Sequence, residues 1–243
     1  MADRSLIVQR WLMILLLGAL GVGSFNVFMY SGLQYTTAAN SLLMQAAIPA
    51  LVLLLNLLLF RVAPRLAQII GCIVAAAGVL VIIFKGDPAA VTQMRFNHGD
   101  ALVLCACVLW ALYTVLLRLR PAVNGMSFLA LTICVGVIAM APFSVMELQR
   151  RAVHLTPAVV AGIGYVAVFP SILAYYLYTK AVEESGAGDA GQVVNLQPLF
   201  GAVLASLILG EPFDGHHVVG MVLILVGIGI PFVLASRRRV GNG

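Results

Sequence analysis

The amino-acid sequence predicts an all-α, polytopic membrane protein with eight transmembrane helices, and two observations lead to this class. The first is composition: 62% of the 243 residues are hydrophobic, 9% are charged, and the mean hydropathy is +1.06. A soluble domain carries about 25% charged residues, so this chain has too few polar groups to cover its apolar surface in water. The second observation is a series of eight apolar runs, each near the length of about 20 residues that crosses a bilayer.

These runs follow one another with short links, which leave no space for a soluble domain. The first run is too long for a signal peptide, and no small-residue cleavage site stands out before the second. Glycine and proline inside the runs do not argue against helices, because membrane helices tolerate both. The predicted spans are residues 11–33, 38–60, 66–84, 100–117, 126–146, 157–178, 187–209 and 216–235.

Lysine and arginine are distributed unequally between the two sides of the predicted spans. With the N-terminus in the cytoplasm, ten of these basic residues fall on the cytoplasmic side and four on the outer side. Such residues favour the cytoplasmic side, so both termini are predicted to be cytoplasmic, in the cell (inner or plasma) membrane. No basic stripe joins with exposed aromatic residues, so we expect no nucleic-acid partner.

The sequence contains an internal repeat, in which a shift of 149 residues superposes several residues, a proline and two glycines among them, without gaps. The shift spans five predicted helices, and an odd number reverses the direction of the chain across the membrane. Two antiparallel repeats with matched prolines are typical of secondary transporters, where interrupted helices mark the transport site. The matched pairs are Ala38 and Ala187, Pro49 and Pro198, Gly71 and Gly220, and Gly78 and Gly227.

The two predicted repeats are unequal in length. Residues 1–99 form an incomplete first repeat of three helices, and residues 100–243 form a second repeat of five. Because 100 minus 149 is −49, the counterparts of two helices would lie before Met1. The alternatives are an eight-helix variant and a chain that starts at an internal methionine; we expect the reading frame upstream of Met1 to encode two further spans.

Four short motifs occur in order along most of the chain: GLQYTTAAN at 32–40, LWALY at 109–113, AYYLY at 174–178 and NLQPLF at 195–200. Together they resemble the EamA family of the drug/metabolite transporter superfamily. The resemblance implies ten helices in two inverted five-helix repeats, and transport of small metabolites such as amino acids, sugars and drugs. This chain departs from the family in lacking the first two helices, and in having Phe60-Arg61-Val62 where Leu-Gly-Glu commonly closes the helix.

Amides and aromatic residues within the spans are the candidate site residues. An amide that faces lipid has no hydrogen-bond partner, so we expect these amides to line a shared central cavity; the alternative is that they join helices. Trp110 and Tyr113 share one helix face in mid-span, as cavity lining or as ordinary packing. The predicted substrate-binding residues are Asn26, Gln45, Pro49, Trp110, Tyr113, Tyr175, Gln192, Asn195, Gln197 and Pro198.

No catalytic residues, metal site or cofactor are predicted. The four cysteines lie in apolar runs without ligand spacing, and the histidines lie in loops. Neither HExxH nor GxSxG occurs, which argues against an enzyme, and no P-loop is present to use ATP. Small residues at Ala202, Ser206 and Gly210 are typical of close helix packing, within the bundle or at a homodimer face.

These observations predict a secondary transporter, not driven by ATP, that moves a small metabolite such as an amino acid or drug-like compound by alternating access. The alternative is a truncated or non-transporting membrane subunit of the same fold.

Overall fold

A computed structural model describes residues 2–87, 96–150, 155–209 and 214–240 of the protein, and within these ranges the regular structure is entirely helical. The helices are α1 (Ala2–Gln9), α2 (Trp11–Leu17), η1 (Gly18–Ser24), α3 (Phe25–Leu33), α4 (Ala38–Gln45), α5 (Ile48–Phe60), α6 (Leu66–Ile83), α8 (His98–Leu116), η2 (Leu117–Leu119), α9 (Gly125–Arg150), α10 (Pro157–Val166), η3 (Ala167–Ala174), α11 (Tyr175–Ser185), α12 (Ala187–Gln192), η4 (Val193–Asn195), α13 (Leu196–Leu209) and α14 (Gly215–Val240).

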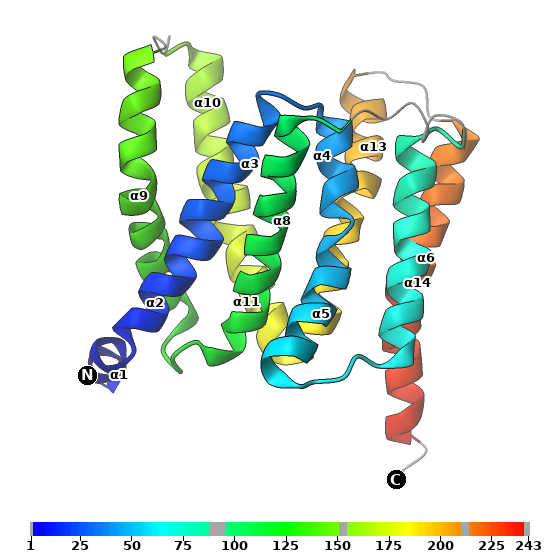
Figure 1. Cartoon of the computed structure of the whole chain (residues 1–243), viewed down its shortest axis with the longest axis horizontal. Helices are drawn as coiled ribbons and strands as arrows, with labels where there is room; N and C mark the ends of the chain where they lie inside the picture. The colour runs from blue at the N-terminus through cyan, green and yellow to red at the C-terminus, as the bar shows by residue number, and fades with distance from the viewer. Residues whose placement is uncertain (1, 88–95, 151–154, 210–213, 241–243) are drawn as a thin grey trace.

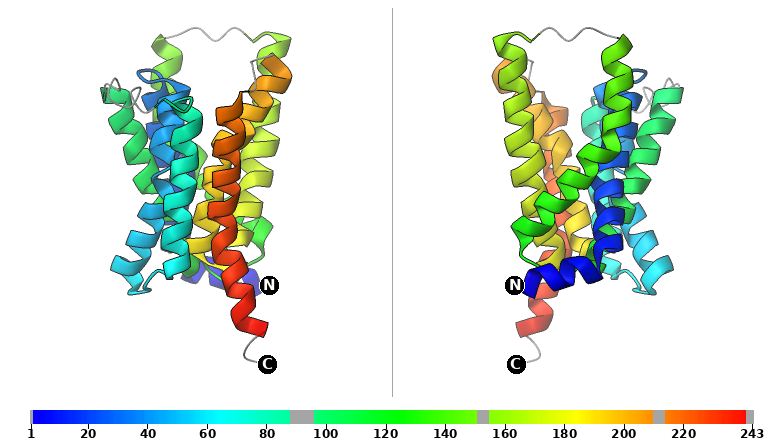
Figure 2. Two further views of the ribbon diagram at one scale, coloured as in Figure 1. Left: turned by 90° about the vertical axis from the view of Figure 1, so that its right-hand side faces the viewer. Right: turned by 90° about the vertical axis from the view of Figure 1, so that its left-hand side faces the viewer.

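The helices stand side by side in an up-and-down bundle (Figure 1). Both termini lie at the same end, which we call the termini end, and the other end is called the opposite end. The short helix α1 lies across the bundle at the termini end (Figure 2). Arg61 follows α5 at this end, and Arg118 lies in η2. Arg61 and Arg118 therefore lie beside the termini, whereas Lys85 follows α6 at the opposite end; the orientation of the two ends in the cell stays a prediction.

Seven helical stretches within the described residues are long and apolar enough to cross a membrane. They make the chain a multi-pass membrane protein. The remaining predicted span, 187–209, is helical as α12, η4 and α13, but it is not among the seven. Its first half contains Asp189, Gln192 and Asn195, which make it more polar than the other spans. An eighth crossing therefore stays a prediction. The seven are Trp11–Leu33, Ala38–Phe60, Leu66–Ile83, His98–Leu119, Gly125–Gln149, Pro157–Ser185 and Gly215–Leu234.

Two helices are interrupted directly before the matched prolines. Pro49 is the second residue of α5, and Pro198 is the third residue of α13. Proline disfavours helical conformation in the residue before it and donates no backbone hydrogen bond. Both breaks contain a tighter helical turn. At the first break, Ala47 donates its backbone N–H to the carbonyl of Met44, three residues back, at 3.1 Å; at the second, η4 is a 3₁₀ turn. The backbone at each break thus finds partners inside its own chain segment.

The α5 helix ends where the sequence departs from the Leu-Gly-Glu pattern. Arg61 caps it with φ 53°, in the left-handed region that favours glycine. Its backbone N–H donates to the Leu57 carbonyl at 2.9 Å, so the helix end is closed despite the unfavourable residue. The shift of 149 residues places Gly210 at the matching position of the second repeat.

Helices α6 and α14 pack backbone to backbone through four glycines. A Cβ atom added to Gly78 would lie 2.6 Å from the Gly220 carbonyl oxygen, and one added to Gly227 would lie 2.6 Å from the Gly71 carbonyl oxygen. The shift of 149 residues maps Gly71 on Gly220 and Gly78 on Gly227, so each contact maps on the other with its partners exchanged. Reciprocal contacts of this kind are expected from two segments related by a two-fold axis, although the full repeat plan stays a prediction.

The α10 and η3 segments contrast with this tight pair. Neither contains a buried residue, and α10 stands on a different side of the bundle from α9 (Figure 2). Apolar side chains such as Ile163 and Phe169 are therefore exposed. The buried core lies elsewhere, around α8, where Val103, Ala106 and Ala111 are fully enclosed.

Candidate functional site

Four aromatic rings gather around Trp110 of α8, and we call these five residues the aromatic cluster. The Trp110 ring centroid lies 4.8 Å from that of Phe25, 5.1 Å from that of Tyr178, and 5.4 Å from those of Tyr113 and Tyr175. The Tyr175 ring meets Trp110 edge-on at 84°, a favourable arrangement for aromatic pairs. The cluster thus joins α3, α8 and α11, which are distant in the sequence.

The tyrosine hydroxyls of the aromatic cluster all have partners. Tyr175 donates to the Gly21 carbonyl at 2.7 Å, and the Tyr178 hydroxyl lies 2.9 Å from Thr114 Oγ1. The Tyr113 hydroxyl makes a longer contact, 3.5 Å from Thr179 Oγ1. Buried tyrosines normally find such partners. The cluster is therefore a fixed wall with its polar atoms already satisfied.

The partner of Tyr175 belongs to a distorted helix. Gly21 lies in η1, a π-helical segment, and the Tyr113 ring packs directly on it, where no Cβ would fit. Asn26 donates its side-chain amide to the Val22 carbonyl at 2.8 Å in the same segment. A second π-helical segment, η3, leads directly into Tyr175. Such distortions occur often at functional sites, and here both adjoin the aromatic cluster.

The first helix break holds a satisfied amide. Gln45 Nε2 donates to Ser41 Oγ at 3.3 Å, and Ser41 Oγ lies 3.5 Å from Met29 Sδ. Pro49 is buried immediately beyond the break. This arrangement links α4 to α3 through a short polar chain.

The second helix break holds unsatisfied amides. Gln192 and Asn195 are both 0% exposed. Gln192 Nε2 donates to the Gln68 carbonyl at 3.3 Å, but Gln192 Oε1 and both amide atoms of Asn195 have no partner among the described residues. Buried polar groups are hydrogen-bonded in the great majority of cases. These three atoms are therefore buried side-chain polar groups without a protein partner among the described residues.

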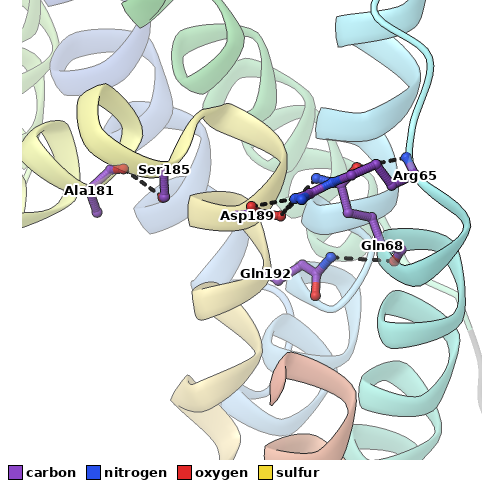
Figure 3. Close-up of polar contacts among 6 residues, drawn as sticks. All are labelled: Arg65, Gln68, Ala181, Ser185, Asp189 and Gln192. Carbon is purple, nitrogen blue, oxygen red and sulfur yellow. Dashed lines mark hydrogen bonds and ion pairs between the residues drawn. The ribbon is translucent and has the colours of Figure 1, made fainter. Parts of the chain in front are cut away.

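An ionic network lies close to the second break (Figure 3), at the start of α6, which is at the termini end (Figure 1). Arg65 Nη2 donates to both carboxylate oxygens of Asp189, at 2.6 Å from Oδ1. Gln68 Nε2 donates to the same Oδ1 at 2.7 Å, while Gln68 Oε1 accepts the backbone N–H of Arg65 at 2.9 Å. Arg65 and Gln68 thus cap α6, and both of them also bind the carboxylate of Asp189 in α12. Gln192 reaches the same turn of α6 through its bond to the Gln68 carbonyl.

The structure brings the predicted site residues together in groups. Trp110, Tyr113 and Tyr175 share the aromatic cluster. Gln192 and Asn195 lie together at the second break, beside which Pro198 is buried. The remaining amides are placed differently: Asn26 bonds to the Val22 carbonyl and to the Tyr175 side chain of the aromatic cluster, Gln45 bonds within α4, and Gln197 is exposed. Whether these groups share one cavity with Pro49 stays a prediction.

Several residues around the site were not among the predicted ones. Tyr178 resembles an interfacial-belt residue in the sequence, yet its ring packs on Trp110; its spacing of three residues from Tyr175 is the signal for a shared face. Gln68 could have been found in the same way as Gln192, because each is an amide inside a predicted apolar span. The pairing of Arg65 with Asp189 has no local signal, because 124 residues separate them.

No three His, Cys, Asp or Glu side chains within the described ranges lie together as a metal site would require. The chemistry that these residues provide is recognition: aromatic faces for apolar or π surfaces, and amides for hydrogen bonds. The tyrosine, threonine and amide groups are neutral. The carboxylate of Asp189 in the ionic network is already paired with Arg65.

Comparisons with known proteins agree with this description. The model of the EamA-like transporter family matches residues 2–84 and 97–232. The chain is 28% identical over 217 residues to an uncharacterized transporter, YyaM, of Bacillus subtilis, covering 88% of this chain and 70% of that protein. It is 25% identical over 231 residues to a probable terminal-alkyne amino-acid exporter of Streptantibioticus cattleyicolor, covering 95% of this chain and 74% of the exporter. A solved crystal structure superposes with a TM-score of 0.79 at 18% identity, over 96% of this chain and 80% of that one, and shows the same fold.

Proposed function

Because the chain belongs to the EamA-like transporter family, we propose that it is a secondary transporter that moves a small, amphipathic metabolite across the membrane by alternating access. In this proposal the chain crosses the cell (inner or plasma) membrane eight times, with the termini end in the cytoplasm. ATP takes no part, since the sequence has no P-loop.

The observation that carries the proposal is the unsatisfied amide pair at the second helix break. Gln192 and Asn195 present two oxygens and one amide nitrogen without partners in a fully buried position. Leaving such groups unpaired costs about 1–3 kcal/mol each, so a structural role alone would favour apolar residues there. A passing substrate that both donates and accepts hydrogen bonds satisfies these atoms.

The substrate class follows from the two kinds of surface. Amides recognise polar groups without requiring a net charge, and the aromatic cluster offers an apolar wall around Trp110. An amino acid with an apolar or aromatic side chain combines both features. One relative named as an amino-acid exporter is consistent with this class, so we propose amino acids or similar drug-like amphiphiles as substrates.

Alternating access is supported by the paired breaks and by the reciprocal glycine contacts. Interrupted helices at corresponding places of two inverted repeats are the usual location of a transport site. The breaks before Pro49 and Pro198 occupy such places under the shift of 149 residues. We propose that residues 1–99 and 100–243 act as the two EamA repeats that move against each other.

Counterflow in proteoliposomes tests the function. The purified chain is reconstituted, the vesicles are loaded with unlabelled phenylalanine, leucine or propargylglycine, and uptake of the labelled form is measured. We expect saturable exchange of at least one of these amino acids, and none in vesicles without protein. A folded protein that exchanges none of them would contradict the amino-acid assignment and favour the non-transporting subunit.

A further inference from the structure

We propose that Arg65 and Asp189, supported by Gln68 and Gln192, form a latch that holds the termini end of the transport path closed. The inference rests on the proposed function, because it assigns a role in gating to residues beside the proposed site. We call these four residues the latch. Its contacts join the start of α6 to α12, which belong to different predicted repeats.

The ion pair of the latch is buried on its carboxylate side, whereas the Arg65 side chain is 43% exposed. The Asp189 side chain is 11% exposed, and both its oxygens accept from Arg65 while Oδ1 also accepts from Gln68. Hydrogen bonds to charged groups are about twice as strong as neutral ones. A surface ion pair contributes little in comparison, as for Lys180 and Glu184, which lie 3.8 Å apart and are mostly exposed. We therefore expect the Arg65–Asp189 pair to oppose separation of α6 from α12 more strongly than the Lys180–Glu184 pair opposes any local motion of α11.

The latch coincides with closure of the path around it. All six residues of α12, Ala187–Gln192, are buried. Gly188 is packed so closely that an added Cβ would lie 2.7 Å from Gln68 Nε2. In the proposal, α12 is the segment that would have to move to admit solvent from the termini end. It is held by Arg65 and Gln68, and each of its residues is buried.

The matched positions at the opposite end lack this arrangement. A shift of 149 residues pairs Asp189 with Asn40, and Arg65 with Asp214. Asn40 carries no charge and Asp214 is exposed, so no guanidinium–carboxylate pair forms between them. The residues of α4 that match the start of α12, Ala38 and Ala39, are exposed. Within the described residues, the ion pair at the termini end therefore has no counterpart at the matched positions of the opposite end.

A cysteine reporter on α12 tests the latch without requiring transport. Ala190, 1% exposed, is replaced by cysteine after the four native cysteines are changed to alanine, and labelling by a membrane-impermeant maleimide is followed in inside-out and right-side-out vesicles. Asp189→Asn or Arg65→Gln should increase the labelling rate from the termini side about ten-fold or more, since a charge-assisted bond to a buried group is lost. Lys180→Gln, which breaks the exposed pair at the same end, should leave the rate within about two-fold.

A charge exchange keeps the test informative where a single variant is unstable. The double variant Arg65→Asp with Asp189→Arg should restore protection relative to either single change. Unchanged labelling in Asp189→Asn, or a double variant that is labelled as fast as the single variants, would overturn the latch. Labelling does not depend on a substrate, so the two proposals can fail separately. If Asp189→Asn is labelled faster but the unaltered protein exchanges no amino acid, the proposed function is refuted and the latch is supported.

Discussion

The aromatic cluster and the second helix break are both buried in the bundle, but they treat polar atoms in opposite ways. In the aromatic cluster the hydroxyls of Tyr113, Tyr175 and Tyr178 all have partners. At the second break, Asn195 has none for either amide atom within the described part of the chain. The first region is therefore fully hydrogen-bonded within the protein, and the second contains buried polar atoms that the described residues leave unpaired. We expect the aromatic cluster to contribute mainly to stability and the second break to the proposed transport.

The largest effect on stability is expected from Trp110→Ala. This change removes the ring that the four other members of the aromatic cluster contact, and we expect the free energy of unfolding to fall by about 3–5 kcal/mol. Thermal unfolding in detergent measures it. The control is Trp11→Ala, because Trp11 is 53% exposed at the start of α2 and should contribute far less. Equal loss in the two variants would show that the cluster is not a structural centre.

A smaller effect of opposite sign is expected from Asn195→Leu. Removing an unsatisfied buried amide should raise the free energy of unfolding by about 1–3 kcal/mol. The same change should lower amino-acid exchange about ten-fold or more, since the substrate loses its hydrogen bonds. Unfolding and counterflow are measured on the same preparation.

Asn26→Leu is the matched control for this prediction, because its amide donates to the Val22 carbonyl and is satisfied. We expect this variant to lose about 0.5–1.5 kcal/mol of stability. A destabilised Asn195→Leu, comparable with Asn26→Leu, would mean that Asn195 is paired after all and would remove the contrast between the two regions.

The smallest effect is expected from Gln197→Ala. Gln197 lies two residues beyond Asn195 but is exposed, and surface substitutions usually change stability by less than about 0.5 kcal/mol. Exchange should remain within about two-fold of the unaltered protein. A loss of exchange as large as that of Asn195→Leu would extend the recognition surface beyond the buried amides.

The sequence was sufficient for the elements and for the position of the breaks. Apolar runs define seven of the spans because bilayer thickness fixes their length, and the breaks lie where Pro49 and Pro198 predict them. The family resemblance is confirmed by the match to the EamA-like transporter family. These features depend on residues close together in the chain.

The state of each amide was not predictable in the same way. Gln45 and Asn195 look equivalent in the sequence, yet only Gln45 has a neighbour, Ser41, that accepts its hydrogen bond. The ion pair of Arg65 with Asp189 depends on how α6 and α12 meet in space. Such properties follow from tertiary packing, which spacing alone does not specify.

Under the proposed alternating access, the glycine contact between α6 and α14 is a place where the two helices could pivot. The two contacts, Gly71 with Gly227 and Gly78 with Gly220, lie on either side of Ala75 and Ile224, which are both fully enclosed. Backbones that touch without side chains between them permit a change of crossing angle, but separation would open a void along the whole contact. Rocking about this point would open the bundle at one end while it closes the bundle at the other end. Loosening Arg65 from Asp189 at one end would then draw the helices together at the other.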